Sequence, residues 1–214
     1  MELISIVTPC YNEEGSIAEL CDKIRSVFSV LKDYDYEHVI IDNFSTDNTR
    51  AILRVMAEKD SRIKVIFNSR NFGYIRSCHH AILQTIGSSV VVIAADLQDP
   101  PELLPVFLEK WKEGYHSILA VKRSSQESRF KFALRSIYYK LAKILSDEVP
   151  MIENFFGFGL YDRKVINCLK EIDDPYPYLR GVISEIGMKQ TIVKYDQPIR
   201  ARGETKFDLY RIFD

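Results

Sequence analysis

The sequence predicts an α/β fold in which a mostly parallel central sheet carries helices on both faces. Short apolar runs alternate with stretches of helical periodicity through the first 121 residues. Repeated β-α-β order at this spacing is typical of parallel strands joined by crossover helices. The unbroken apolar run 90–95 suits a strand that is buried on both faces. The 214 residues, 46% of them hydrophobic, suffice for one packed domain.

The expected elements follow one another in a regular order. Apolar runs predict strands at 4–8, 39–41, 65–67, 90–95, 118–121 and 191–195. Helical spacing of apolar residues predicts helices at 17–31, 52–56, 75–86 and 103–111, and another that starts near Tyr178. Parallel strands present their carboxyl ends at one edge of a sheet, where ligands bind. Functional residues are therefore expected directly after each strand.

The region after the alternating pattern is basic. Seven basic residues and one acid lie between 121 and 143, with apolar residues at helical spacing. This predicts a basic amphipathic helix over 122–143. One interpretation is a core-packing helix with a solvated basic face, and the other is a helix resting on anionic lipid headgroups.

Charge and cysteine content exclude several classes of protein. The 29 Lys and Arg against 30 Asp and Glu leave a net charge of −1, which argues against a nucleic-acid partner. No apolar run approaches the ~18 residues that a membrane span needs, so this chain alone is expected to be soluble. The four cysteines lack zinc-finger spacing and are expected to be reduced thiols.

The first two strands end in short polar segments. Residues 8–14, T-P-C-Y-N-E-E, combine a proline, an aromatic ring and polar groups that could stack on a base, although Asn12 could instead cap the next helix. After the second strand, Asp42 could accept hydrogen bonds from a nucleobase or ribose, or belong to a turn. Ser45 and Asp47 are interpreted mainly as helix caps.

The fourth strand ends in A-D-L-Q-D-P-P-E, residues 95–102. In extended chain, Asp96 and Gln98 would point the same way, and two oxygen donors suit a hard divalent cation that also binds diphosphate. Asp99 has two interpretations. It is either a functional carboxylate or the N-cap of a helix with Pro100 at N1 and Glu102 completing a capping box.

These segments, together with S-R-N-F-G at 69–73, resemble family 2 glycosyltransferases with the GT-A (Rossmann-like) fold. Within that family, the sequence most resembles the polyprenyl-phosphate glycosyltransferases, which include dolichol-phosphate mannose synthase and bactoprenol glucosyltransferases. Segments 160–163, 178–181 and 202–206 also resemble that subgroup, so the likeness covers nearly the whole chain.

The resemblance implies roles for matching residues. The nucleotide sugar would be held by Pro9, Tyr11, Glu13, Asp42 and Asp96, and Mg²⁺ or Mn²⁺ by Asp96 and Gln98. The lipid phosphate or donor diphosphate would lie near Arg180, Arg202 and Lys206. The catalytic candidates are Asp96, Asp99 and Glu153.

The sequence departs from the family pattern at three places. Asp42-Asn43-Phe44-Ser45 replaces D-D-G-S and Ala94 replaces a frequent Asp, which removes charge near the nucleotide and metal. Gly157 stands where an acid is often proposed as the base. A sugar hydroxyl needs a base, whereas a phosphate monoester, with a second pKa of about 6, is already largely dianionic. The loss therefore favours a phosphate acceptor, with Asp99 or Glu153 as substitute bases.

The expected function is metal-dependent, inverting transfer of a sugar from a nucleotide sugar to polyprenyl phosphate. A UDP-sugar is favoured, with GDP-mannose as the other candidate donor. The alternatives are transfer to a sugar hydroxyl in glycan synthesis, or nucleotide-sugar binding without catalysis.

The expected organisation is a catalytic domain at 1–196 and a basic juxtamembrane, acceptor-side tail at 197–214, cut before membrane spans. The expected location is the cytoplasmic face of the bacterial inner membrane. The membrane surface is an expected partner, and homo-oligomerisation stays open.

Overall fold

The computed structural model describes residues 1–123, 155–172, 174 and 179–198. Its strands are β1 (Glu2–Cys10), β2 (Tyr34–Asp42), β3 (Ile63–Phe67), β4 (Ser89–Val92), β5 (Ser117–Lys122), β6 (Phe155–Asp162) and β7 (Gln190–Tyr195). Its helices are α1 (Ile17–Val30), α2 (Thr49–Lys59), α3 (Tyr74–Leu83), the short 3-10 helix η1 (Pro101–Leu103), α4 (Leu104–Lys112), α6 (Arg163–Ile172) and α7 (Leu179–Ile186).

The strands form one sheet in the order β3-β2-β1-β4-β6-β5-β7. β1 pairs in parallel with both β2 and β4. The chain first adds β2 and β3 on one side of β1 and then adds β4 on its other side. This reversal is a topological switch point. β6 runs antiparallel to β4 and β5, while β7 is parallel to β5. The predicted mostly parallel α/β sheet is confirmed.

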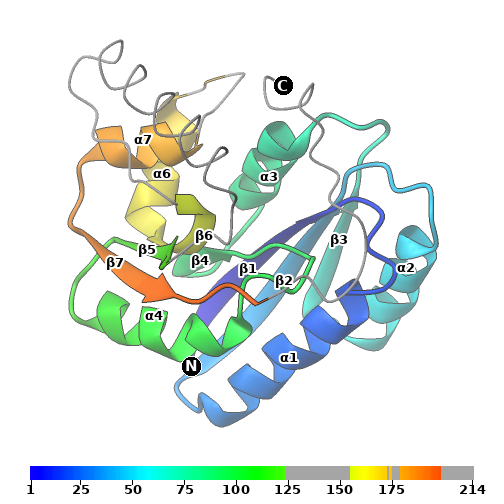
Figure 1. Cartoon of the computed structure of the whole chain (residues 1–214), viewed down its shortest axis with the longest axis horizontal. Coiled ribbons are helices and arrows are strands. Elements are labelled where there is room, and N and C mark those ends of the chain that lie inside the picture. The colour runs from blue at the N-terminus through cyan, green and yellow to red at the C-terminus, as the bar shows by residue number, and fades with distance from the viewer. Residues whose placement is uncertain (124–154, 173, 175–178, 199–214) are drawn as a thin grey trace.

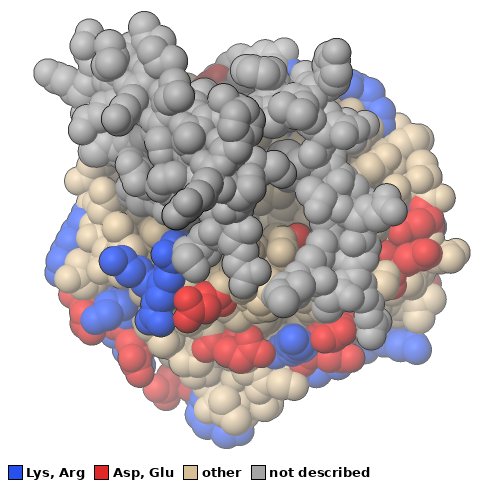
Figure 2. Space-filling model, in the orientation of Figure 1, with Lys and Arg blue, Asp and Glu red and all other residues tan. Residues whose placement is uncertain are grey.

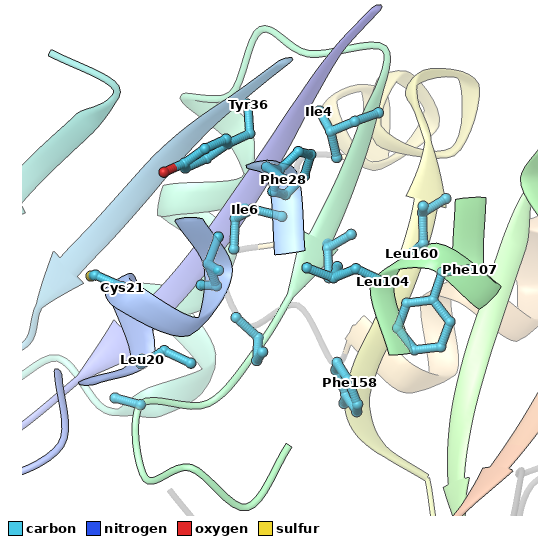
Figure 3. Packing of buried hydrophobic residues seen from close by; sticks show 14 of the residues in the cluster. Ile4, Ile6, Leu20, Cys21, Phe28, Tyr36, Leu104, Phe107, Phe158 and Leu160 are labelled. Carbon is cyan, nitrogen blue, oxygen red and sulfur yellow. The ribbon is translucent and has the colours of Figure 1, made fainter. Parts of the chain in front are cut away.

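Each face of the sheet is covered by helices (Figure 1). α1, α2 and α4 pack on one face, where Ile4, Ile6 and Phe107 are fully buried. α3, α6 and α7 pack on the other face, against a second cluster that includes Val7 and Ile82. Alternate β1 side chains thus enter opposite layers. Figure 3 shows the first layer, where Leu20 and Phe28 of α1 and Leu104 of α4 point toward the strands.

The visible outer surface is mixed in charge. Figure 2 shows basic and acidic residues interspersed over α1 and α4. Ion pairs such as Lys23–Glu19 at 3.6 Å and Lys110–Glu113 at 2.8 Å join neighbouring helical turns. This agrees with the near-neutral net charge of the whole chain.

Every predicted strand is present, with some bounds moved. β2 begins five residues earlier than the expected 39–41 strand, and β4 leaves the ladder after Val92, although Ile93 and Ala95 stay buried. β6 and α6 match no expected element. Glycines at 157 and 159 interrupt the apolar pattern of β6, which weakens the periodic signal of a strand.

Several expectations fall on residues that the structure does not describe. Lys122 ends β5 rather than starting a helix, and 124–143 of the predicted basic helix lies outside the described residues. Most of the predicted tail, 199–214, also lies outside them. In the described part of the chain, no helix is both long and apolar enough to cross a membrane.

Candidate active site

The carboxyl ends of the parallel strands gather the polar segments singled out by sequence. Cys10 at the end of β1 pairs with Asp42 at the end of β2, and β4 ends on the other side of β1. The segments after these three strands therefore meet at the switch point, as expected for a ligand site in such a sheet.

The loops after β1 and β2 are joined by hydrogen bonds. Asn12, at a positive φ of 55°, donates its backbone N–H to Ser45 Oγ at 2.8 Å. Its Oδ1 accepts the backbone N–H of Thr46 at 2.7 Å. Glu13 donates its backbone N–H to Thr49 Oγ1 at 2.8 Å. The two loops therefore form one rigid wall of the site.

These contacts correct two of the predicted helix caps. Asn12 binds the 45–46 turn instead of capping α1, and Ser45 accepts from Asn12 instead of capping α2. Asn48 is the N-cap of α2 and makes no side-chain capping bond. Asp47 retains a local role, since its Oδ1 accepts the backbone N–H of Thr49 at 3.0 Å.

The candidate nucleotide residues differ in accessibility. Pro9 is buried within β1, whereas Tyr11 and Glu13 are partly exposed in the following loop. Glu13 Oε2 accepts the hydroxyl of Ser16 at 2.8 Å. Asp42 is 0% exposed, and its carboxylate accepts the backbone N–H of Ser45 at 3.2–3.3 Å.

Asn43, the first departure from D-D-G-S, lies in a structural network. Its Oδ1 accepts hydrogen bonds from Asn68 Nδ2 at 3.1 Å, the Phe72 backbone N–H at 2.9 Å and Ser77 Oγ at 2.9 Å. Its Nδ2 donates to Asn71 Oδ1 at 2.8 Å. The amide thus fastens the 69–73 loop to β2, a structural role that was not predicted from the sequence.

The segment after β4 is a turn. Leu97 has a positive φ of 63°, and Asp96 Oδ1 accepts the backbone N–H of Gln98 at 3.1 Å. The assumption of extended chain between Asp96 and Gln98 is therefore wrong. Asp96 and Gln98 are nevertheless both partly exposed at the switch point, with Leu97 of the turn between them.

Asp99 joins this turn to β7. Its Oδ2 accepts the Ala94 backbone N–H at 3.1 Å, and its Oδ1 accepts the Tyr195 hydroxyl at 3.0 Å. The predicted capping box is wrong, because Pro100 is the N-cap residue of η1 and no side chain bonds there. Burial raises the pKa of Asp99 to about 6, and the charge of Asp96 also raises it. The hydrogen bonds from Ala94 and Tyr195 and the charge of Lys122 act in the opposite direction and lower it.

The glycine at the position of the often-proposed base lies in an irregular part of β6. The pairing register between β5 and β6 shifts between Leu119 and Val121, and Gly157 within the shifted stretch has φ +100°. Tyr161 donates its hydroxyl to the Gly157 carbonyl at 2.9 Å. An L-residue rarely adopts this backbone conformation, so the strand geometry itself disfavours an acid here.

Sequence reasoning missed three residues at this edge. Tyr195 and Lys122 are the last residues of β7 and β5, and Lys122 Nζ lies 4.2 Å from the centroid of the Phe156 ring. Both residues lie at or next to the ends of strands predicted from the sequence, and this position could have identified them as candidates. Tyr74 follows the 69–73 loop. Although 42% of its side chain is exposed, burial around its hydroxyl, with Cys78 and Asp99 as neighbours, raises its pKa.

The remaining candidates are only partly placed. Arg180 lies on α7 by its backbone. Glu153, Arg202 and Lys206 lie outside the described residues. Among the described residues, no three His, Cys, Asp or Glu side chains form a group that could hold a metal by themselves.

The switch-point sheet shares its fold with solved glycosyltransferases of the GT-A type. The chain belongs to glycosyltransferase family 2: the model "Glycosyl transferase family 2" matches residues 5–170. This confirms the family expected from the motifs.

Named relatives support the same assignment. The chain is 38% identical to an uncharacterized glycosyltransferase, YkcC, of Bacillus subtilis over 97% of its own length, but spans only 64% of that relative. It is 34% identical to a prophage bactoprenol glucosyl transferase homolog of Escherichia coli, over 99% of this chain and 69% of the relative. A solved mannosyl-3-phosphoglycerate synthase from Rubrobacter xylanophilus shares the fold, with a TM-score of 0.64 and 19% identity over 99% of this chain and 70% of that one.

Proposed function

We propose that the chain transfers a sugar from a nucleotide sugar to polyprenyl phosphate, with inversion at the anomeric carbon. A UDP-sugar is the favoured donor over GDP-mannose, and the reaction takes place at the cytoplasmic face of the bacterial inner membrane. The catalytic domain is 1–196, and 197–214 serves the acceptor side. The observation that carries the choice of acceptor is the likeness to bactoprenol glucosyl transferases, at 33–34% identity.

The donor set after β4 fits a divalent metal. Asp96 and Gln98 offer a carboxylate and an amide oxygen, the hard ligands that Mg²⁺ and Mn²⁺ take. Two protein ligands leave room for diphosphate oxygens and water, which is how Mg²⁺ is usually held beside a substrate phosphate. When bound, such an ion neutralises negative charge on the departing nucleotide diphosphate.

The chain's own residues supply binding and alignment. Tyr11 and Glu13 line the nucleotide end, and the buried Pro9 and Asp42 support them from within the strands. Asp99 holds the turn that carries Asp96 and Gln98 through its bond to Ala94. Arg180, Arg202 and Lys206 are proposed to attract the acceptor phosphate or donor diphosphate. Alignment of a ready nucleophile accounts for most of the rate.

The geometry at Gly157 suits a phosphate acceptor. A phosphate monoester needs no proton removed as it attacks, whereas a sugar hydroxyl does. Both oxygens of Asp99 already accept hydrogen bonds, from Ala94 and Tyr195, so this carboxylate is engaged in holding the turn. Asp99 and Glu153 remain the proposed bases should the acceptor carry a hydroxyl.

The test is a transfer assay with the purified chain. Radiolabelled UDP-glucose, UDP-GlcNAc or GDP-mannose is mixed with undecaprenyl phosphate, with and without EDTA. We expect a labelled lipid product that EDTA abolishes and that Asp96→Ala lowers by about 100-fold or more, the usual cost of losing one group that stabilises developing charge. Asp33→Ala, at a site where 81% of the side chain is exposed, is the matched control.

Other outcomes separate the alternatives. Product on a saccharide acceptor, with none on lipid phosphate, would support the sugar-hydroxyl function instead. Nucleotide binding by calorimetry without turnover of any donor would indicate a non-catalytic binder. Unchanged formation of the lipid product by Asp96→Ala would contradict the proposed role of Asp96 in metal binding.

A further inference from the structure

The turn after β2 holds an unusual aromatic residue. Phe44 has a positive φ of 68°, and the residue is 41% exposed. A bulky L-residue in the left-handed region is a real outlier, and such strain persists where surrounding contacts fix it, often at ligand sites. An exposed ring contributes little to a core, so packing does not account for this residue.

Contacts around the turn explain how the strain is maintained. Ser45, next to Phe44, accepts from Asn12 by its hydroxyl and donates its backbone N–H to Asp42. On the other side, Asn43 is anchored to the 69–73 loop. The residues before and after Phe44 are thus fixed, and Ser45 joins this turn to Asn12 in the loop after β1, which forms the nucleotide end of the proposed site.

Arg50 contacts both the carboxylate of Asp42 and the ring of Phe44. Its Nε lies 3.4 Å from Asp42 Oδ2, and its guanidinium carbon lies 5.6 Å from the centroid of the Phe44 ring and 5.1 Å from that of Phe67. Asp42 is 0% exposed, so its carboxylate is not the surface that an incoming base meets. Among the described residues, the buried Arg50 Nε has no hydrogen-bond partner, and the guanidinium is placed by the charge of Asp42 and by the rings of Phe44 and Phe67.

We propose that Phe44 is the stacking surface for the nucleobase of the donor, and that Asp42 acts from behind it by holding the 42–45 turn and Arg50. This rests on the proposed function and deepens it, because it names the residue that contacts the base. Stacking on an aromatic ring suits any base, since every base has a π-face. Phe44 therefore provides affinity for nucleoside diphosphates, and the choice among bases comes from other groups.

The test exploits the backbone strain. Phe44→Gly removes the ring and places at φ 68° the residue that adopts this conformation without penalty. We expect its melting temperature to equal or exceed that of the wild type, while its Kd for UDP in the presence of Mn²⁺, measured by calorimetry, rises at least about fivefold, the lower end for loss of one aromatic stack. A merely structural Phe44 predicts the reverse pattern.

Three controls test whether the change in UDP affinity comes from the loss of the Phe44 ring. Phe44→Trp keeps a ring and should bind UDP within about twofold of the wild type. Arg54→Gln alters a cation that lies 4.8 Å from the far ring, Phe67, and should leave UDP affinity unchanged. Inorganic pyrophosphate with Mn²⁺ lacks a base, so its affinity should be equal in wild type and Phe44→Gly.

Each contrary result has a definite meaning. If the wild type binds UDP and Phe44→Gly binds it equally well, or if pyrophosphate affinity falls in parallel, the stacking role is overturned while the proposed function stands. If the wild type binds neither UDP nor GDP, the proposed function fails and this inference falls with it.

Discussion

Single polar residues at the carboxyl edge divide into two groups. Asp42, Asn43 and Asp99 have their side-chain oxygens occupied by neighbouring loops. Tyr11 and Asp96 are partly exposed there. A buried polar group that loses its partner costs far more than a typical hydrogen bond contributes, so the first group keeps the loops in place for the second.

Asn43→Asp should destabilise the protein. The substitution places a carboxylate oxygen against Asn71 Oδ1, which cannot turn away because it also accepts the Gly73 backbone N–H at 2.9 Å. We expect a loss of about 1–3 kcal/mol in the free energy of unfolding, measured with urea. Asn48→Asp, at the exposed N-cap of α2, should change stability little. Equal stability of Asn43→Asp and wild type would contradict the network.

His38 should make folding sensitive to acid. It is 1% exposed, with Nε2 2.8 Å from Thr8 Oγ1 and Nδ1 3.6 Å from the sulfur of Cys21. Burial lowers its pKa to about 3, from 6.5 when unfolded. Between those values the unfolded chain binds the extra proton, so stability falls as the pH falls.

We expect this histidine to cost about 2 kcal/mol of stability between pH 7 and pH 5. Urea unfolding at both values should show a smaller difference in His38→Gln than in wild type. His80→Gln, at an exposed position of α3, is the control. An unchanged pH dependence in His38→Gln would refute the assignment.

At the scale of elements, the site depends on strands that are distant in sequence. β7 reaches the turn after β4 through the bond between Tyr195 and Asp99, and the Tyr195 ring packs edge-on against Phe158 of β6 at 5.6 Å. β6 brings its irregular stretch, with Gly157, to the same edge. This part of the candidate site is thus assembled from the second half of the chain.

Tyr195→Phe should weaken this connection. It deprives the Asp99 carboxylate of one donor while the ring packing stays. We expect the free energy of unfolding to fall by about 1–3 kcal/mol and Mn²⁺ binding, followed by calorimetry, to weaken because the 94–99 turn is less fixed. Tyr115→Phe, at a partly exposed position, should leave both quantities unchanged. If Tyr195→Phe binds Mn²⁺ with normal affinity, the hydrogen bond between Tyr195 and Asp99 contributes to stability but not to metal binding.

At the scale of the whole molecule, one sheet separates two apolar layers. Ile6 belongs to the layer under α1 and α4, and Ile82 to the layer under α3 and α6. The same strands contribute to both layers, so the two should unfold together. This shared sheet also holds the strand ends in register, which keeps the loops of the site at one edge.

Truncations in the two layers test that cooperativity. Ile6→Ala and Ile82→Ala, both at 0% exposure, should each cost about 2–5 kcal/mol. Ile86→Ala, at 68% exposure, should stay within about 0.5 kcal/mol of wild type. All three should unfold in one transition by both circular dichroism and fluorescence. Two separate transitions would contradict a single cooperative unit.

The class of fold, most of its strands and helices, and the edge that gathers the polar segments could be predicted from the sequence alone. These features are written in local periodicity and in the residues directly after each strand. The direction of β6 and the identity of the polar side chains that hold loops follow only from the assembled fold. Asn43 meets Asn71, 28 residues away, and Asp99 meets Tyr195, 96 residues away. Such partners depend on strand order, which no local pattern encodes, and so the loop-holding contacts of Asp99 and Asn43 emerge only when the sheet is assembled.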